Sequence, residues 1–83
     1  MTKKELIKLI QDAQALHAQS IILADTDEEA SDKAYTEYWE MNRKIADWIR
    51  TFSMGMIDEK TALQMTVHKK GEVLELAKKW RGF

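Results

Sequence analysis

Apolar residues recur every three or four positions along most of the chain, which is the spacing of one face of an α-helix. The first stripe follows a capping box, in which Thr2 and Glu5 satisfy free backbone amides at a helix start. Its members are Leu6, Leu9, Ile10, Ala13, Leu16, Ile21, Leu23 and Ala24. We therefore expect a first helix over about residues 3–24.

The strongest pattern lies between residues 34 and 52, where apolar side chains are spaced four, three, four, three and four residues apart. They are Ala34, Tyr38, Met41, Ile45, Trp48 and Phe52. This a/d spacing is typical of a helix packed against other helices, and further apolar residues widen the arc. A second capping box at Thr26 and Glu29, and a C-cap at Gly55, predict a central second helix over about residues 27–53.

A third segment begins after Asp58, which is suited to an N-cap. Its apolar register continues across Gly71 to Trp80, so we expect one helix over about residues 59–80. The glycine costs only about 1 kcal/mol relative to alanine inside a helix. The alternative is a break at Lys70-Gly71 that gives two short helices.

Composition supports one small all-α domain over residues 1–83, an antiparallel bundle of three long helices. Proline is absent and there are only three glycines, whereas β-structure needs many turn residues. Cysteine is also absent, which removes disulfides and thiolate metal sites and fits a reducing compartment. The N-terminal residues contain no signal peptide or membrane span. We expect a cytoplasmic protein that makes no membrane contact.

The sequence contains no recognisable catalytic chemistry. Its serines lie outside nucleophile motifs, no glycine-rich phosphate loop is present, and the two histidines are far apart. We therefore expect no enzyme activity, no cofactor and no metal. His17 projects from the first apolar stripe, where a core histidine with a hydrogen-bond partner is the favoured interpretation and a pH-sensitive or ligand-contacting residue the alternative.

The most unusual feature is an acidic stretch with aromatic residues at its edge. Residues 25–40 contain seven acidic side chains and one lysine, a local charge of −6 in a chain whose total is −1. Acids that complement a helix N-terminus are the plain explanation, and a docking surface for a basic partner is the functional one. The predicted partner-binding residues are Asp27, Glu28, Asp32, Tyr35, Glu37, Trp39 and Glu40. We expect Trp80 to belong to the core, whereas Trp39 fits core and interface equally well.

These features favour a small protein-binding protein, such as an adaptor, an inhibitor or an immunity-type protein. A narrower form is a phage or mobile-element inhibitor of a basic, nucleic-acid-handling host enzyme. One alternative is a structural homo-oligomer that pairs its surplus apolar surface with itself. Another is a nucleic-acid accessory protein that uses the basic C-terminus, although a pI of about 6.1 argues against it.

Overall fold

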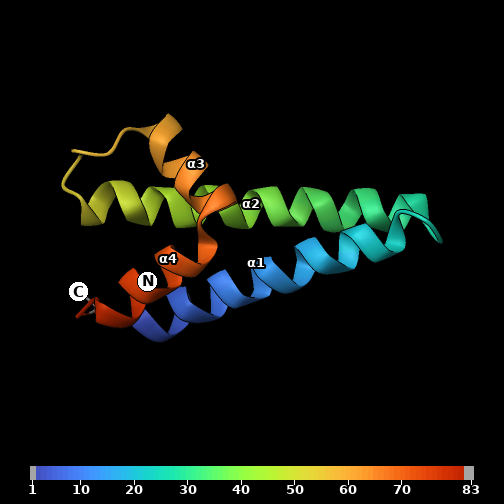
Figure 1. Ribbon diagram of the computed structural model, residues 1–83, viewed down its shortest axis with the longest axis horizontal. Coiled ribbons are helices and arrows are strands. Elements are labelled where there is room, and N and C mark those ends of the chain that lie inside the picture. The colour runs from blue at the N-terminus through green and yellow to red at the C-terminus, as the bar shows by residue number, and fades with distance from the viewer. Residues whose placement is uncertain (1, 82–83) are drawn as a thin grey trace.

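The computed structural model describes residues 2–81, and this part of the chain forms four α-helices (Figure 1). They are α1 (Lys3–Leu23), α2 (Glu28–Phe52), α3 (Glu59–His68) and α4 (Lys70–Lys79). The long helices α1 and α2 form an antiparallel hairpin. The all-helical fold is confirmed. The predicted bundle of three long helices is not, because the third segment forms two short helices.

Side-chain caps define the helix starts. The Thr2 hydroxyl accepts a hydrogen bond from the Glu5 amide at 3.1 Å, as predicted. The predicted cap at Thr26 is wrong, because that residue belongs to the turn and the Asp27 carboxylate accepts from the Ala30 amide at 3.1 Å instead.

Asp58 caps α3, as expected, by accepting from the Thr61 amide at 2.7 Å. The pKa of the Asp58 carboxyl lies below its ordinary value, chiefly because the Thr61 side chain and amide hydrogen-bond to it.

The end of α2 differs from the prediction by one residue. The Gly55 amide donates to the Arg50 carbonyl at 2.9 Å and the Met54 amide to the Thr51 carbonyl at 3.1 Å, which is a Schellman motif. The left-handed position of this motif usually holds glycine. Here it holds Met54 (φ 57°), and Gly55 (φ 83°) follows. Met54 therefore carries the backbone strain that a glycine would avoid.

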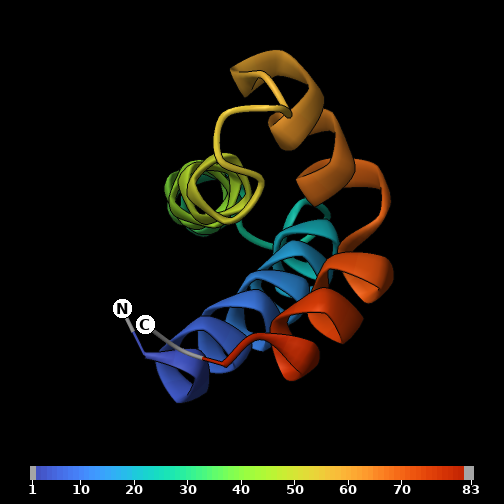
Figure 2. The same cartoon turned by 90° about the vertical axis from the view of Figure 1, so that its left-hand side faces the viewer.

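The third predicted helix breaks at Lys69, two residues before Gly71. Lys69 has φ −133° and ψ 42°, which lies outside the helical region. Gly71 is not the cause, since its φ is not left-handed and a Cβ there would meet no atom within 4 Å. The break lets α3 contact α2 while α4 turns away to contact α1 (Figure 2). One straight helix could not follow both members of the hairpin.

Lys70 stabilises this break. Its side chain is only 8% exposed, and its ammonium donates to the Tyr38 hydroxyl at 2.9 Å and to the Thr66 carbonyl at 2.8 Å. In an unbroken helix the Lys70 amide would bond to the Thr66 carbonyl, so the ammonium replaces a hydrogen bond that the break removes. The same ammonium lies 4.4 Å from the centre of the Tyr38 ring.

The core lies between the hairpin and the two short helices. Tyr38, Trp48 and Trp80 are buried, as predicted, but Phe52 is 45% exposed, so its assignment to the core is wrong. Other core residues are Leu6, Ile10, Ala13, Ile45, Ala46, Ile49, Ala62, Val73 and Ala77. The core is thus confined to the part of the hairpin that α3 and α4 cover.

The other half of the hairpin projects beyond α3 and α4 (Figure 1). We call residues 18–40 the arm. Ile21, expected in the apolar stripe of α1, is 60% exposed because no third helix covers the arm. The two helices are joined there by the Ser31 hydroxyl, which donates to the Ser20 carbonyl at 2.8 Å.

Replacing Lys70 should show how much the break depends on its ammonium. We expect Lys70→Met to lower the free energy of unfolding by about 1–3 kcal/mol, because the Thr66 carbonyl loses a buried donor. Lys79→Met, on the exposed side of α4, is the control and should change stability by less than about 0.5 kcal/mol. Urea titration followed by circular dichroism measures both. Equal stability of the two variants would contradict the role given to Lys70.

Asn42 is fully buried, and neither its Nδ2 nor its Oδ1 has a hydrogen-bond partner within residues 2–81. We expect Asn42→Leu to raise the free energy of unfolding by about 1 kcal/mol, since an unpaired buried amide is costly. Thr66→Val is the matched contrast, because the Thr66 hydroxyl donates to the Ala62 carbonyl at 2.8 Å and its loss should destabilise. Destabilisation by Asn42→Leu would show that the amide is satisfied.

The strain at Met54 gives a third prediction. We expect Met54→Gly to raise the free energy of unfolding by up to about 1 kcal/mol, because glycine adopts a left-handed φ without steric cost. Met56→Gly is the control: Met56 is equally exposed, at 91%, but has no left-handed φ. Thermal unfolding should separate the two variants, and a Met54→Gly protein no more stable than Met56→Gly would rule out strain at this position.

Candidate functional site

One face of the arm combines acidic and aromatic side chains. Glu28, Asp32, Tyr35 and Trp39 are separated by four, three and four residues, so they follow one line along α2. Farther along α2 the same line continues to Arg43 and Ala46, where Glu59 and Leu63 of α3 lie against it. By contrast, α3 does not extend over the first part of α2 (Figure 1), and Glu28, Asp32 and Tyr35 are exposed there. We call these four residues the acidic–aromatic line.

The aromatic residues of the line form a connected group. Tyr35 is 48% exposed, and its ring lies edge-on to Trp39 with centroids 6.0 Å apart. Trp39 is half-buried, packs against the core and meets Tyr38 edge-on at 6.0 Å. The core thus holds Trp39 in place, and Trp39 in turn positions the exposed Tyr35. Large aromatic side chains are enriched among binding hot spots.

The acidic residues of the arm have no cationic partner in the described structure. The ion pairs formed within residues 2–81 lie elsewhere and join Lys8 to Asp12, Asp47 to Arg50, and Glu75 to Lys78. The unpaired, exposed acids are Asp25, Asp27, Glu28, Glu29, Asp32, Glu37 and Glu40. Within residues 25–40 the cationic side chain is Lys33, which leaves this stretch with a net charge of −6.

The structure groups only some of the seven predicted partner-binding residues. Glu28, Asp32, Tyr35 and Trp39 share the line described above. Asp27 is occupied as the N-cap of α2. Glu37 lies two residues from both Tyr35 and Trp39 and therefore faces the other side of α2. Glu40 lies about a quarter turn around the helix axis from Trp39, so it is not on the line either. Sequence order alone had placed these residues in one patch.

His17 lies at the base of the arm. The prediction of a core histidine is wrong, because the residue is exposed. One face of its ring stacks on Tyr38, with centroids 4.8 Å apart and planes 13° from parallel. The Tyr38 ring thus joins α1 to the Lys70 ammonium, and the structure gives His17 a packing role.

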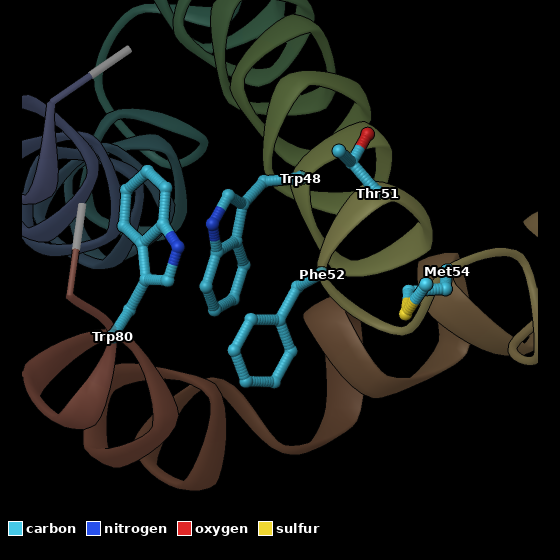
Figure 3. A pocket seen from close by; sticks show the side chains of 5 residues that line it. All are labelled: Trp48, Thr51, Phe52, Met54 and Trp80. Carbon is cyan, nitrogen blue, oxygen red and sulfur yellow. The ribbon is translucent and has the colours of Figure 1, made fainter. Parts of the chain in front are cut away.

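A second feature, an apolar hollow, lies at the opposite end of the molecule from the turn of the arm (Figures 1 and 3). Its volume is about 440 Å³, and it is lined by Trp48, Thr51, Phe52, Met54 and Trp80. Trp48 stacks on Phe52 with centroids 5.0 Å apart and meets Trp80 at 5.5 Å with planes 67° apart. Sequence reasoning missed this hollow because it assigned the aromatic residues to a closed core.

Within the described residues, no group of three or more His, Cys, Asp or Glu side chains is arranged to hold a metal ion. None of the helices formed by residues 2–81 is long and apolar enough to cross a bilayer. Among the described residues, the acidic–aromatic line and the apolar hollow expose side chains that packing within the fold leaves without a partner.

No protein-family model, curated protein or solved structure matches this chain. The function has to be inferred from the two surfaces themselves.

Proposed function

We propose that this chain is a non-enzymatic protein-binding protein whose arm docks on a basic surface of another protein. One observation carries the proposal: the exposed Tyr35 and the half-buried Trp39 that contacts it lie in line with unpaired, exposed carboxylates on α2. Folding alone does not require this combination. In such a role the protein acts as an adaptor or an inhibitor.

The chemistry of the line suits arginine and lysine side chains. A carboxylate such as Asp32 accepts two parallel hydrogen bonds from a guanidinium, and the face of an adjacent ring attracts the same cation. Tyr35 and Trp39 also supply apolar area that surrounds these contacts and excludes water. The remaining acids of the arm, which face other directions, increase the rate of encounter with a basic partner.

The basic partner is most readily a protein that handles nucleic acid, since such proteins carry lysine and arginine surfaces to neutralise phosphates. An arm that occupies this surface would block it. An inhibitor of this kind, encoded by a phage or a mobile element, or an immunity-type protein, is the narrowest form of the proposal and rests on size and acidity together with the arm.

A synthetic arginine-rich helical peptide is a suitable probe for the first test. Titrated into isotope-labelled protein, it should shift the backbone amide signals of residues 28–39 at low salt, whereas its glutamate-for-arginine counterpart should shift none. Added salt should weaken binding, since exposed charges are screened over about 8 Å at physiological ionic strength. Shifts spread evenly over all acidic residues would indicate only general charge attraction.

Two variants with the same charge change separate a defined site from general attraction. Asp32→Asn removes a carboxylate from the acidic–aromatic line, and Glu37→Gln removes one from the other side of α2. We expect the first to weaken peptide binding about threefold to tenfold and the second by less than about twofold. Tyr35→Ala, which leaves the charge unchanged, should also weaken it. Equal effects of Asp32→Asn and Glu37→Gln would overturn the proposal.

A further inference from the structure

The apolar hollow and the tip of the arm lie at opposite ends of the molecule, whose longest dimension is 42 Å (Figure 1). We propose that the hollow of one molecule binds the arm tip of a second copy, so that molecules associate head to tail. The inference shares the arm with the proposed function and rests on the arm being a contact surface. It adds a second binding site and names its occupant.

The hollow presents apolar side chains that the fold itself leaves without a partner. Phe52 and Met54 are 45% and 91% exposed. Met54 lies at the edge of the hollow and has a strained, left-handed backbone conformation. Backbone strain of this kind gathers at binding sites. The Trp48 Nε1 is buried without a hydrogen-bond partner in the described residues, and it lies on the ring edge that faces Trp80 (Figure 3). The two buried indoles thus line the inner side of the hollow, and the exposed Phe52 and Met54 line its outer side.

Positive charge lies on one side of this end of the molecule, where α4 ends, whereas Asp47 and Asp58 lie on the side of α2 and α3. Trp80 is flanked by Lys79 and Arg81, which are exposed and form no ion pair in the described residues. The start of α1, with Lys3 and Lys4, lies beside the end of α4 (Figures 1 and 2). From residue 76 to the end of the sequence there is no acidic side chain.

The tip of the arm has the complementary composition. Ile21 and Ile22, near the end of α1, are 60% and 69% exposed, and they form an apolar centre. Asp25, Glu28 and Glu29 follow directly in the turn and the first residues of α2 and are exposed. An apolar centre with an acidic margin thus matches an apolar hollow with a basic margin, which is the usual anatomy of a protein interface.

Charge decides between head-to-tail and twofold association. A twofold contact through the hollow would bring two basic margins together, and one through the arm would bring two acidic surfaces together, so like charges would repel in both. Head-to-tail contact pairs opposite charges. The total charge of −1 also leaves little net repulsion between copies. Because such a contact joins two different surfaces, each molecule can bind two others, and the expected product is a chain or a ring of molecules.

A charge-swap experiment with the whole chain tests this directly. Wild-type protein at low salt should show a weight-average mass that rises with concentration and reaches about twice the monomer mass at ~1 mM, as a weak contact predicts. One variant carries Asp25→Lys and Glu29→Lys at the tip of the arm, and the other carries Lys79→Glu and Arg81→Glu beside the hollow. Each alone should remain monomeric, and their equimolar mixture should associate again. Sedimentation equilibrium measures all three samples.

Two further variants control for net charge and for the apolar contact. Asp12→Lys with Glu72→Lys gives the same charge change as the arm variant, but away from both ends, and should associate like wild type. Phe52→Ser should reduce association without any change of charge. Circular dichroism confirms that each variant is folded.

Several outcomes would overturn the inference. Wild-type protein that stays monomeric at low salt would contradict it. A mixture of the two charge-swapped variants that fails to associate would also contradict it. Association that stops at a dimer and ignores the charge swaps would point to a twofold contact instead. The variant with Lys79→Glu and Arg81→Glu should still bind the arginine-rich peptide, because its arm is unchanged. Wild-type protein that binds the peptide but does not self-associate would therefore refute this inference alone, whereas wild-type protein that self-associates but does not bind the peptide would refute the proposed function alone.

Discussion

The arrangement of this protein depends on a buried ammonium group at the break between α3 and α4. The Lys70 side chain occupies the space where a helical hydrogen bond would otherwise satisfy the Thr66 carbonyl, and it bonds at the same time to Tyr38 of α2. A buried amine needs such partners, because an unpaired charge in the core is costly. The break, the direction of α4 and the attachment of both short helices to the hairpin are therefore linked through one side chain.

The consequence for function is that the hairpin is covered unequally. The chain changes direction between α3 and α4, which are ten residues long each. The two short helices therefore cover only the half of the hairpin near the termini (Figure 1). The arm is left as two helices, whose outer faces contact solvent. An unbroken third helix of about 33 Å would instead have run along the whole hairpin and buried the line that holds Tyr35 and Trp39. The break thus creates the surface on which the proposed function rests.

Much of the fold could be predicted from the sequence, because local chemistry determines it. The caps at Thr2 and Asp58 and the central position of α2 follow from hydrogen-bond donors, acceptors and apolar spacing. The break could not be predicted in the same way. The residues buried along α3 and α4 are Ala62, Thr66, Lys70, Val73, Ala77 and Trp80, a register that requires a lysine in the core. Lysine is almost never fully buried, so apolar spacing alone did not indicate that Lys70 belongs to the core.

The candidate site was predictable in composition but not in geometry. Seven acids close together in the sequence indicated a charged surface, yet a helix distributes successive residues around its axis. Only helical spacing combined with the end of α3 shows that Asp32 and Tyr35 face the same open side as Trp39. The hollow could not be predicted from spacing along α2. Phe52 belongs to the a/d seam of that helix, but the hollow beside it also depends on the position of Trp80, which contacts Trp48 from the end of α4. Contacts between segments that far apart do not leave a signal in local sequence.

The acidic arm also has a simpler explanation, in which its acids only complement the positive N-terminus of α2. This explanation accounts for Asp27, Glu28 and Glu29, which lie at the cap and in the first turn. It does not account for Asp32, Glu37 and Glu40, because the favourable effect of the helix dipole falls off within the first turn. Nor do lysines or arginines of neighbouring helices offset these three acids by ion pairing in the described structure. Acids that neither cap the helix nor pair within the fold keep their charge available to another molecule, and of the three only Asp32 shares a face with the exposed ring of Tyr35.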